Sequence, residues 1–124
     1  MCLIDGDQTE FSIYERAWLN ALLEYDFPEK QLVAYQLNSA AIEREYTAYH
    51  LFLKFSVDKA VPPILTSSRT DIEMCAYKEG EVPTAFVLHI IDGYVAYLEV
   101  FHGDSSKISC DFDIGGAKLE YFTP

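Results

Sequence analysis

The residues that decide the fold are 83–101, which read PTAFVLHIIDGYVAYLEVF. Two runs rich in β-branched and aromatic residues, 83–91 and 94–101, flank the pair Asp92-Gly93. This pair suits a two-residue type I′ turn, because both of its positions need a positive φ. The stretch therefore predicts an antiparallel β-hairpin in which Ile91 pairs with Tyr94.

The expected register distributes the side chains of this hairpin over two largely apolar faces. One face would carry Phe86, Leu88, Ile90, Val95, Tyr97 and Glu99. The other would carry Val87, His89, Ile91, Tyr94, Ala96, Leu98 and Val100. We expect such a hairpin at the centre of a sheet, with at least one face under helices. In this register His89 points away from Glu99.

The hydrophobic period is helical nearer the N-terminus. A first helix is predicted by apolar residues three or four positions apart, namely Phe11, Tyr14, Trp18, Leu22 and Tyr25. Thr9 or Ser12 suits its N-cap. Asp26-Phe27-Pro28 should end this helix, since the residue before a proline avoids helical geometry. Pro28 can then open a second helix at about 29–38.

Alternating patterns predict further strands at 40–46, 49–57 and 71–77, with one or two more at about 107–112 and 118–122. This order predicts an α+β fold, with two N-terminal helices packed on one face of a curved five- or six-stranded antiparallel sheet. No linker or repeat interrupts residues 1–124, so we expect a single domain. The exposed concave face of the sheet is the expected docking place for a partner or ligand.

The chain is strongly acidic, with 20 Asp and Glu against 9 Lys and Arg and a formal net charge of −11. A negative field repels phosphates and anionic membrane surfaces, so we expect no direct binding to nucleic acid or to a membrane. The same field attracts basic proteins and raises their association rate. The alternative is that the charge serves solubility alone, and both interpretations stay open at this point.

The carboxylates cluster along the sequence. The groups are Asp5, Asp7 and Glu10; Glu24, Asp26 and Glu29; Glu43 and Glu45; and Asp111 and Asp113 with Glu120. Such residues are usually solvated, and the alternative is a partner site that offers them to Lys or Arg of a basic protein. Tyrosines beside them would supply aromatic anchors. The partner-binding residues expected on this basis are Glu43, Glu45, Tyr46, Asp111, Asp113, Glu120 and Tyr121.

The histidines and cysteines form no complete catalytic or metal-binding motif. Because His50, His89 and His102 lack metal-ligand spacing, no metal site is expected. The odd set Cys2, Cys75 and Cys110 contains no CxxC, which favours reduced thiols in the cytoplasm. Residues 1–10 lack the apolar run of a signal peptide, and no apolar stretch approaches the ~18 residues of a membrane span.

Glu99 is the candidate ligand-binding or catalytic group. A carboxylate in the middle of an apolar strand needs a partner, solvent or protonation. Glu99 would act as a general base in an open sheet cavity, or it would form an ion pair with Arg44 or Lys78 on a neighbouring strand. Both interpretations stay open, and no enzymatic activity is assigned.

Two stretches of the sequence resemble a family. Residues 85–94, AFVLHIIDGY, followed by Leu98-Glu99-Val100-Phe101 and Gly103-Asp104, are similar to the signature LLHVxDGYLxxLEVYxxD of small bacterial α+β proteins. In that family the N-terminal helix ends in LLxxDFPG, and here residues 22–28 read LLEYDFP with Glu29 in place of the glycine. These proteins resemble the immunity proteins of polymorphic-toxin and contact-dependent growth inhibition systems.

The resemblance implies a small cytoplasmic inhibitor that binds a cognate toxin domain, often a basic nuclease. It would neutralise the toxin by plugging the active site or by blocking access of the substrate. No catalysis and no cofactor are implied, and we expect a monomer in a one-to-one complex. No motif carries a toxin-binding residue over to this chain, so Asp92-Gly93 and Glu99 are expected to determine the fold. The alternative function is a small-ligand-binding or enzymatic domain that uses the open sheet cavity around Glu99.

Overall fold

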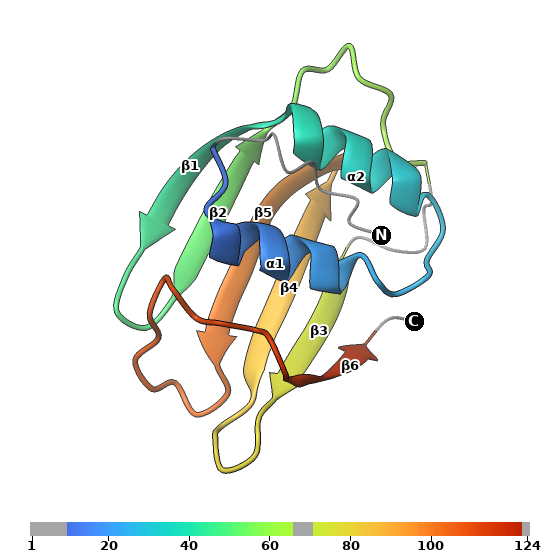
Figure 1. Cartoon of the computed structure of the whole chain (residues 1–124). Coiled ribbons are helices and arrows are strands. Elements are labelled where there is room, and N and C mark those ends of the chain that lie inside the picture. Colours follow the sequence, from blue (N-terminus) through green and yellow to red (C-terminus); the bar gives the residue numbers. More distant parts are fainter. Residues whose placement is uncertain (1–9, 66–70, 123–124) are drawn as a thin grey trace.

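The structure is a computed structural model in which residues 10–65 and 71–122 are described. In these residues two helices precede one six-stranded antiparallel sheet, which confirms the predicted α+β class (Figure 1). Cys2, Asp5, Asp7 and Thr9 lie outside the described residues. The elements are α1 (Ile13–Leu22), α2 (Lys30–Ser39), β1 (Ala41–Tyr46), β2 (Leu51–Ser56), β3 (Asp71–Tyr77), β4 (Thr84–Ile91), β5 (Tyr94–His102) and β6 (Lys118–Phe122).

Helix α1 begins at a capping box. The Ser12 hydroxyl accepts the Glu15 N–H at 3.0 Å, and the Glu15 carboxylate accepts the Ser12 N–H at 2.8 Å. The helix ends at Leu22, earlier than the predicted boundary at Asp26-Phe27-Pro28. Because the chain leaves the helix at this point, Leu23 and Phe27 both reach the core.

The sequence predicted that Pro28 opens the second helix, but α2 begins two residues later, at Lys30. Its N-cap is Glu29, whose φ of 63° lies in the left-handed region and separates the proline from the helix. The buried face of α2 contains Val33, Ala34 and Leu37, together with one polar residue, Gln36. This face lies on the sheet, with α2 nearest to β5.

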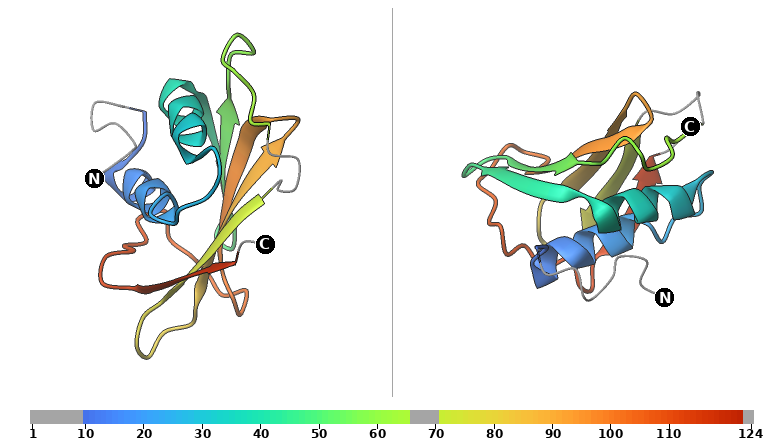
Figure 2. Two further views of the ribbon diagram at one scale, coloured as in Figure 1. Left: turned by 90° about the vertical axis from the view of Figure 1, so that its right-hand side faces the viewer. Right: turned by 90° about the horizontal axis from the view of Figure 1, so that it is seen from above.

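The strands lie in the order β1-β2-β5-β4-β3-β6, and every neighbouring pair is antiparallel. Both helices cover the same face of this sheet (Figure 2). Helix α1 is bonded to both edges, because Glu15 contacts Arg44 of β1 and the Ala21 carbonyl accepts the hydroxyl proton of Tyr121 on β6. The sheet therefore curves around the helices, and the helices fill its concave side.

This curvature corrects the expectation of an exposed concave face. The face that the helices leave uncovered is the opposite, convex one, which we call the free face. It carries the strand residues that alternate with the buried ones: along β3, for example, Ile72 and Met74 are buried while Asp71, Glu73 and Cys75 point the other way.

Residues 107–112 form no strand, contrary to one of the two C-terminal predictions. This segment belongs to the long connection from β5 to β6, and it packs across the end of the helix layer. The indole N–H of Trp18 donates to the Phe112 carbonyl at 2.8 Å, and the Ile108 N–H donates to the Ala48 carbonyl at 2.7 Å. The buried side chains of Ile108 and Ile114 hold the connection against the core.

The hairpin of β4 and β5 turns at Asp92-Gly93 as predicted, with φ values of 53° and 85°. Its register differs from the prediction beyond Val95. A β-bulge shifts the pairing between His89 and Ile90, so that Ile90 pairs with Val95 whereas His89 pairs with Tyr97. The extra residue turns Leu98 and Val100 into the core and moves Glu99 to the free face.

The predicted separation of His89 from Glu99 is therefore wrong, because the bulge brings both onto the free face. Glu99 pairs with Val87, not with Phe86 as the regular register required. Leu98 and Val100, predicted to share a face with His89, lie in the core. The physical cause is the one-residue excess in β5, which inverts the facing of every later residue in the strand.

Candidate functional site

Three cross-strand rows of side chains cover the middle of the free face, and Glu99 lies at their centre. Its direct neighbours are Phe52 on β2 and Val87 on β4. Two rows, read from β2 through β5 and β4 to β3, are Lys54-Tyr97-His89-Asp71 and Phe52-Glu99-Val87-Glu73. The third is Phe101-Ala85-Cys75, and the ring of His50, the residue before β2, stacks on Phe101 at its end. Side chains on neighbouring strands of one face lie close enough to interact, so these rows form one surface.

The Glu99 carboxylate lies between two imidazoles. The Nε2 atom of His50 lies 3.0 Å from Oε2, and the Nε2 atom of His89 lies 3.1 Å from Oε1. On its other side, Nδ1 of His89 lies 3.2 Å from Oδ1 of Asp71. The side chain of Glu99 is 22% exposed and that of His50 is 40% exposed, so solvent and a partner can reach this cluster.

Aromatic rings surround the carboxylate. The His50 ring stacks on Phe52, with centroids 5.3 Å apart and planes at 12°, and on Phe101, with centroids 4.9 Å apart and planes at 21°. The His89 ring stacks on Tyr97 with a centroid distance of 4.3 Å. We call these five rings together with Glu99 the Glu99 cluster. All five rings are half-buried, so each offers part of its surface outward.

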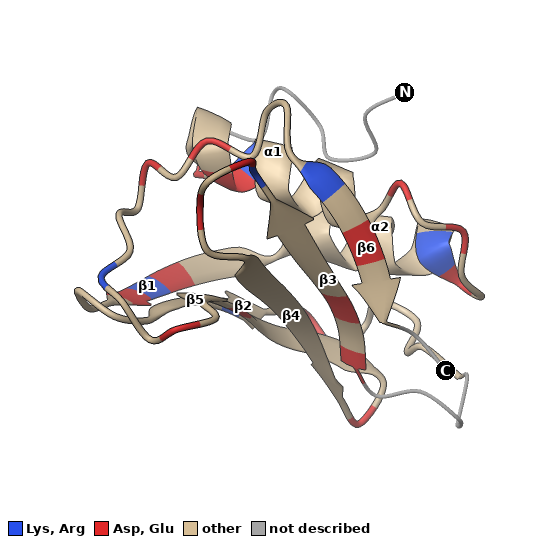
Figure 3. Ribbon diagram, turned by 90° about the horizontal axis from the view of Figure 1, so that it is seen from below, with Lys and Arg blue, Asp and Glu red and all other residues tan. Residues whose placement is uncertain are grey.

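The free face is also where the sheet carries its negative charge. All six carboxylates in the described strands lie on this face, at positions that alternate along each strand with residues that face the helices. Figure 3 shows the acidic residues on β1, β3 and β6. Two lysines, Lys54 and Lys118, share this face, whereas Arg44 points to the helices. The six carboxylates are Glu43, Glu45, Asp71, Glu73, Glu99 and Glu120.

Three of the partner-binding residues expected from the sequence lie on the free face, but at its two edges. Glu43 and Glu45 are on β1, where Glu45 accepts a 2.6 Å hydrogen bond from Lys54. Glu120 is on β6, the strand at the opposite edge. The structure therefore does not bring these carboxylates together in one patch.

The two expected tyrosine anchors lie on the helix side of the sheet. The Tyr46 hydroxyl donates to Glu15 at 2.7 Å, and the Tyr121 hydroxyl donates to the Ala21 carbonyl at 2.7 Å. Tyr121 also stacks on Tyr25, with ring centroids 5.0 Å apart. The aromatic side chains beside Glu99 on the free face are instead Phe52, Tyr97 and Phe101, with the two histidines.

Asp111 and Asp113 lie in the connection between β5 and β6, and both bind neighbouring groups. Asp111 accepts a hydrogen bond from the Ser109 hydroxyl, and Asp113 accepts the Gly115 N–H at 2.8 Å. These contacts order turns of the connection. Both residues are outside the Glu99 cluster.

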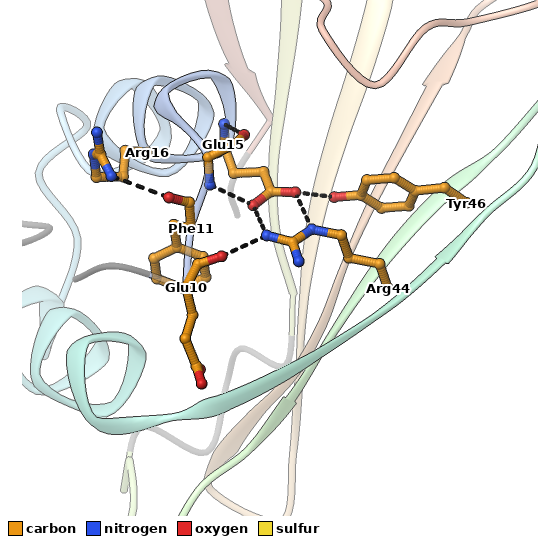
Figure 4. Close-up of polar contacts among 7 residues, drawn as sticks. Glu10, Phe11, Glu15, Arg16, Arg44 and Tyr46 are labelled. Atoms are coloured by element: carbon orange, nitrogen blue, oxygen red, sulfur yellow. Dashed lines mark hydrogen bonds and ion pairs between the residues drawn. The ribbon is translucent and has the colours of Figure 1, made fainter.

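A buried ion pair on the helix side was missed by the sequence analysis. Glu15 is 2% exposed, and its carboxylate accepts hydrogen bonds from Nε and Nη2 of Arg44, each at 2.6 Å, and from Tyr46 (Figure 4). Burial pushes the pKa of Glu15 upward, but the hydrogen bonds from Arg44, the Ser12 N–H and Tyr46 outweigh it and hold this pKa below the ordinary value. Burial and the neighbouring carboxylate raise the pKa of Tyr46.

The Glu15 network, which consists of Glu15, Arg44 and Tyr46, and a separate contact of Lys78 account for the two partners that the sequence predicted for Glu99. Arg44 is taken by Glu15, and Lys78 donates to the backbone carbonyl of Asp113. The only signal for the Glu15 network in the sequence is the capping box, Ser12-x-x-Glu15. That pattern fixes the helix start, but it says nothing of a strand 29 residues later.

The other candidate groups are dispersed. His102 contacts the Thr84 hydroxyl at 2.8 Å on the helix side. Burial raises the pKa of the Cys75 thiol, which lies on β3, while Cys110 is exposed in the β5–β6 connection. Within residues 10–65 and 71–122, no three His, Cys, Asp or Glu side chains are placed to hold a metal ion. No helix in those ranges is long and apolar enough to cross a membrane.

A pocket of about 400 Å³ lies next to the Glu99 cluster but does not include it. It opens where β2 and β5 separate, beyond their last pair, Lys54 and Tyr97. Its lining includes Phe55, Val57, Lys59, Ile91, Tyr94 and Ala96. Lys59 lies over the Tyr94 ring, with its Nζ atom 3.8 Å from the centroid. This pocket is thus separate from the aromatic surface around Glu99.

In comparisons with known proteins, no protein-family model, no curated protein and no solved structure matches the chain.

Proposed function

We propose that this protein is an immunity protein that binds a cognate basic toxin domain and neutralises it. It acts without catalysis and without a cofactor, as a monomer in a one-to-one complex in the cytoplasm. A nuclease is the class of toxin we favour, because a nuclease active site is cationic in order to hold a phosphate backbone. An acidic protein seated on such a site blocks access of the substrate.

One observation carries this proposal: all six carboxylates of the described strands lie on the free face, together with half-buried aromatic rings. A surface for solubility alone needs the charge but not the rings. Aromatic side chains with nearby charges are typical of the residues that dominate binding energy at protein interfaces. The resemblance of the hairpin sequence to immunity proteins agrees with this use of the face.

The proposal assigns different roles to the centre and the rim of the free face. Glu99 and its rings lie on the central strands β2, β5 and β4, or in the case of His50 directly before β2, where a partner would exclude water from them. Glu43 and Glu45 at one edge and Glu120 at the other would guide the approach of the toxin. Asp111 and Asp113 would contribute only at the periphery.

The test is co-purification and calorimetry with the C-terminal domain of the protein encoded immediately upstream, at several salt concentrations. We expect tight binding that weakens as salt rises and that abolishes the toxicity of that domain. Reversing the charges of Glu43 and Glu45 should slow association, and reversing those of Asp111 and Asp113 should change it less. If that domain is toxic and this protein neither binds nor inhibits it, the immunity proposal fails for this pair.

A second candidate function, binding or conversion of a small ligand at Glu99, is favoured by the two imidazoles at 3.0 and 3.1 Å from its carboxylate. A carboxylate between two histidines can hold and move a proton. Small-ligand sites usually bury most of their ligand, whereas Glu99 lies on the convex face with 22% of its side chain exposed. Screening a small-metabolite library by thermal shift, with Glu99→Gln as the reference, tests this candidate: a hit that persists in the variant rejects it.

A further inference from the structure

We propose that the Glu99 cluster is the receptor for one arginine side chain of the partner. This inference rests on the proposed function for the identity of the partner, whereas the chemistry of the cluster does not depend on it. The guanidinium would pair with the Glu99 carboxylate and stack on the neighbouring rings. The cluster would thus be the central contact of the interface.

The Glu99 carboxylate has unused acceptor capacity. An ionised carboxylate offers about four lone-pair positions on its two oxygens. Within the described ranges its ion-pair partners are the two histidines, with one imidazole nitrogen at each oxygen. Each oxygen therefore retains an acceptor position, and two parallel N–H groups of a guanidinium match a pair of such positions.

The charge around Glu99 favours a cation. Asp71 lies at the far side of His89, and Glu73 lies two strands from Glu99 in the same row. The nearest lysine on this face, Lys54, is bound to Glu45 at 2.6 Å. Negative charge therefore lies near the centre of the free face, and the ammonium group of Lys54 pairs with Glu45 on the edge strand β1.

The rings select arginine over lysine. A guanidinium is planar and weakly hydrated, so it stacks on aromatic faces, whereas an ammonium keeps its water. The cluster offers one layer of His50 with Phe52 and Phe101, and a second of His89 with Tyr97. Glu99 lies between the two layers, so a guanidinium that pairs with it is held beside aromatic surface.

The cluster is also fixed before a partner arrives. Its residues lie on three neighbouring strands in the middle of the sheet, except His50, which directly precedes β2. The two histidines restrain the carboxylate through both of its oxygens. A restrained carboxylate loses little conformational freedom on binding, which is the condition for a strong contact.

The experiment uses the labelled full chain and two peptides, acetyl-Gly-Arg-Gly-amide and acetyl-Gly-Lys-Gly-amide, titrated at low salt with NMR detection. We expect the arginine peptide to shift the imidazole signals of His50 and His89 and the carboxyl signal of Glu99. The arginine peptide should bind about tenfold more tightly than the lysine peptide.

Three variants locate the binding. Glu99→Gln should lower affinity for the arginine peptide about tenfold, to the level of the lysine peptide. Phe101→Leu should reduce the preference for arginine while keeping the carboxylate. Glu73→Gln is the matched control, because it removes the same charge from the same face and should change the affinity less than about twofold. Circular dichroism of each variant checks that the sheet is intact.

Equal affinity for the two peptides, or shifts centred on Glu73 or Glu120, would overturn the arginine receptor. The toxin complex then separates the two proposals. If the upstream toxin domain binds Glu99→Gln as tightly as the wild type, the receptor is rejected and the immunity function stands. If the arginine peptide binds as described but the toxin domain does not bind the wild type, the receptor stands and the proposed function is rejected.

Discussion

The Nε2 atom of His89 lies 3.1 Å from Oε1 of Glu99, across the central strand pair β4 and β5. Neither residue belongs to the core, and both point away from the helices. Glu99 is only 22% exposed, since Phe52 and Val87 lie directly beside it. A carboxylate in such a place loses part of its hydration, and a hydrophobic residue would fill the same position at lower cost.

From this position we predict that Glu99→Leu raises the stability of the fold and lowers the affinity for the partner. Leucine would contact the neighbouring rings and remove a partly desolvated charge, so the free energy of unfolding should rise by about 1 kcal/mol. Affinity for the basic partner should fall at least about tenfold. Urea unfolding and calorimetry measure the two effects.

The control for Glu99→Leu is Glu73→Leu, in the same row but exposed on β3. It should leave stability nearly unchanged and weaken binding less. A loss of stability in Glu99→Leu would mean that the histidine contacts hold the fold and that Glu99 is a structural residue.

The turn and the order of the elements could be predicted from the sequence because their causes are local. Asp92-Gly93 supplies the two positive φ values that a type I′ turn needs, and the alternation along β3 predicts its limits, 71–77. The bulge at Ala96 and Tyr97 has no such local signal. Which of two apolar faces becomes the core is decided by the helices, and the first buried positions after Val95 are Leu98 and Val100.

The Glu99 cluster could not be predicted for a related reason. His50 and Glu99 are 49 residues apart, and they meet only because β2 pairs with β5 and the bulge has turned Glu99 outward. Tyr46 and Tyr121 were expected on the partner surface because they are adjacent to carboxylates in the sequence. Adjacent residues of a strand point to opposite faces, so that adjacency separates them in space.

Gln36 predicts a large cost for a small change in α2. It is fully buried, its amide N–H groups donate to the Pro62 and Gly93 carbonyls, and its Oε1 accepts the Val95 N–H at 2.9 Å. Gln36→Leu would remove the side-chain partner of the Pro62 carbonyl and of the Val95 N–H, whereas the Gly93 carbonyl keeps its hydrogen bond from the Ile64 N–H. The free energy of unfolding should therefore fall by about 3 kcal/mol. Gln31→Leu is the same change at an exposed position of α2. Its free energy of unfolding, measured in the same denaturant titration, should differ from that of the wild type by less than about 0.5 kcal/mol.

Gly93 should tolerate a side chain less well than Gly116, although both have positive φ. A Cβ on Gly93 would lie 2.8 Å from the Cβ of Pro63 and 3.0 Å from the Ile64 carbonyl oxygen, whereas a Cβ on Gly116 meets no atom within 4 Å. Gly116→Ala should therefore cost about 1 kcal/mol, from backbone strain alone. Gly93→Ala should cost at least about 2 kcal/mol more, because the loop that contains Pro63 and Ile64 must also move. Equal decreases in melting temperature in the two variants would contradict the close approach of Pro63 and Ile64 to the Asp92-Gly93 turn.

The buried pair of Glu15 and Arg44 predicts a loss of stability in acid. The pKa of Glu15 is lowered in the folded state from the ordinary value of 4.5, so between these values the unfolded chain binds more protons than the folded one. The stabilisation is complete above pH 4.5 and is lost as pH falls through the lower, folded pKa.

Glu15→Gln removes this dependence and, at pH 7, should cost about 2 kcal/mol, because Arg44 and Tyr46 lose their charged partner. The difference between wild type and Glu15→Gln, measured by urea unfolding from pH 7 to pH 3, should therefore shrink at the acid end. Glu43→Gln, on the opposite side of β1, controls for the loss of one negative charge. A difference that stays constant down to pH 3 would mean that the charge of Glu15 does not hold α1 to β1, and that the hydrogen bonds of the capping box and of Tyr46 suffice.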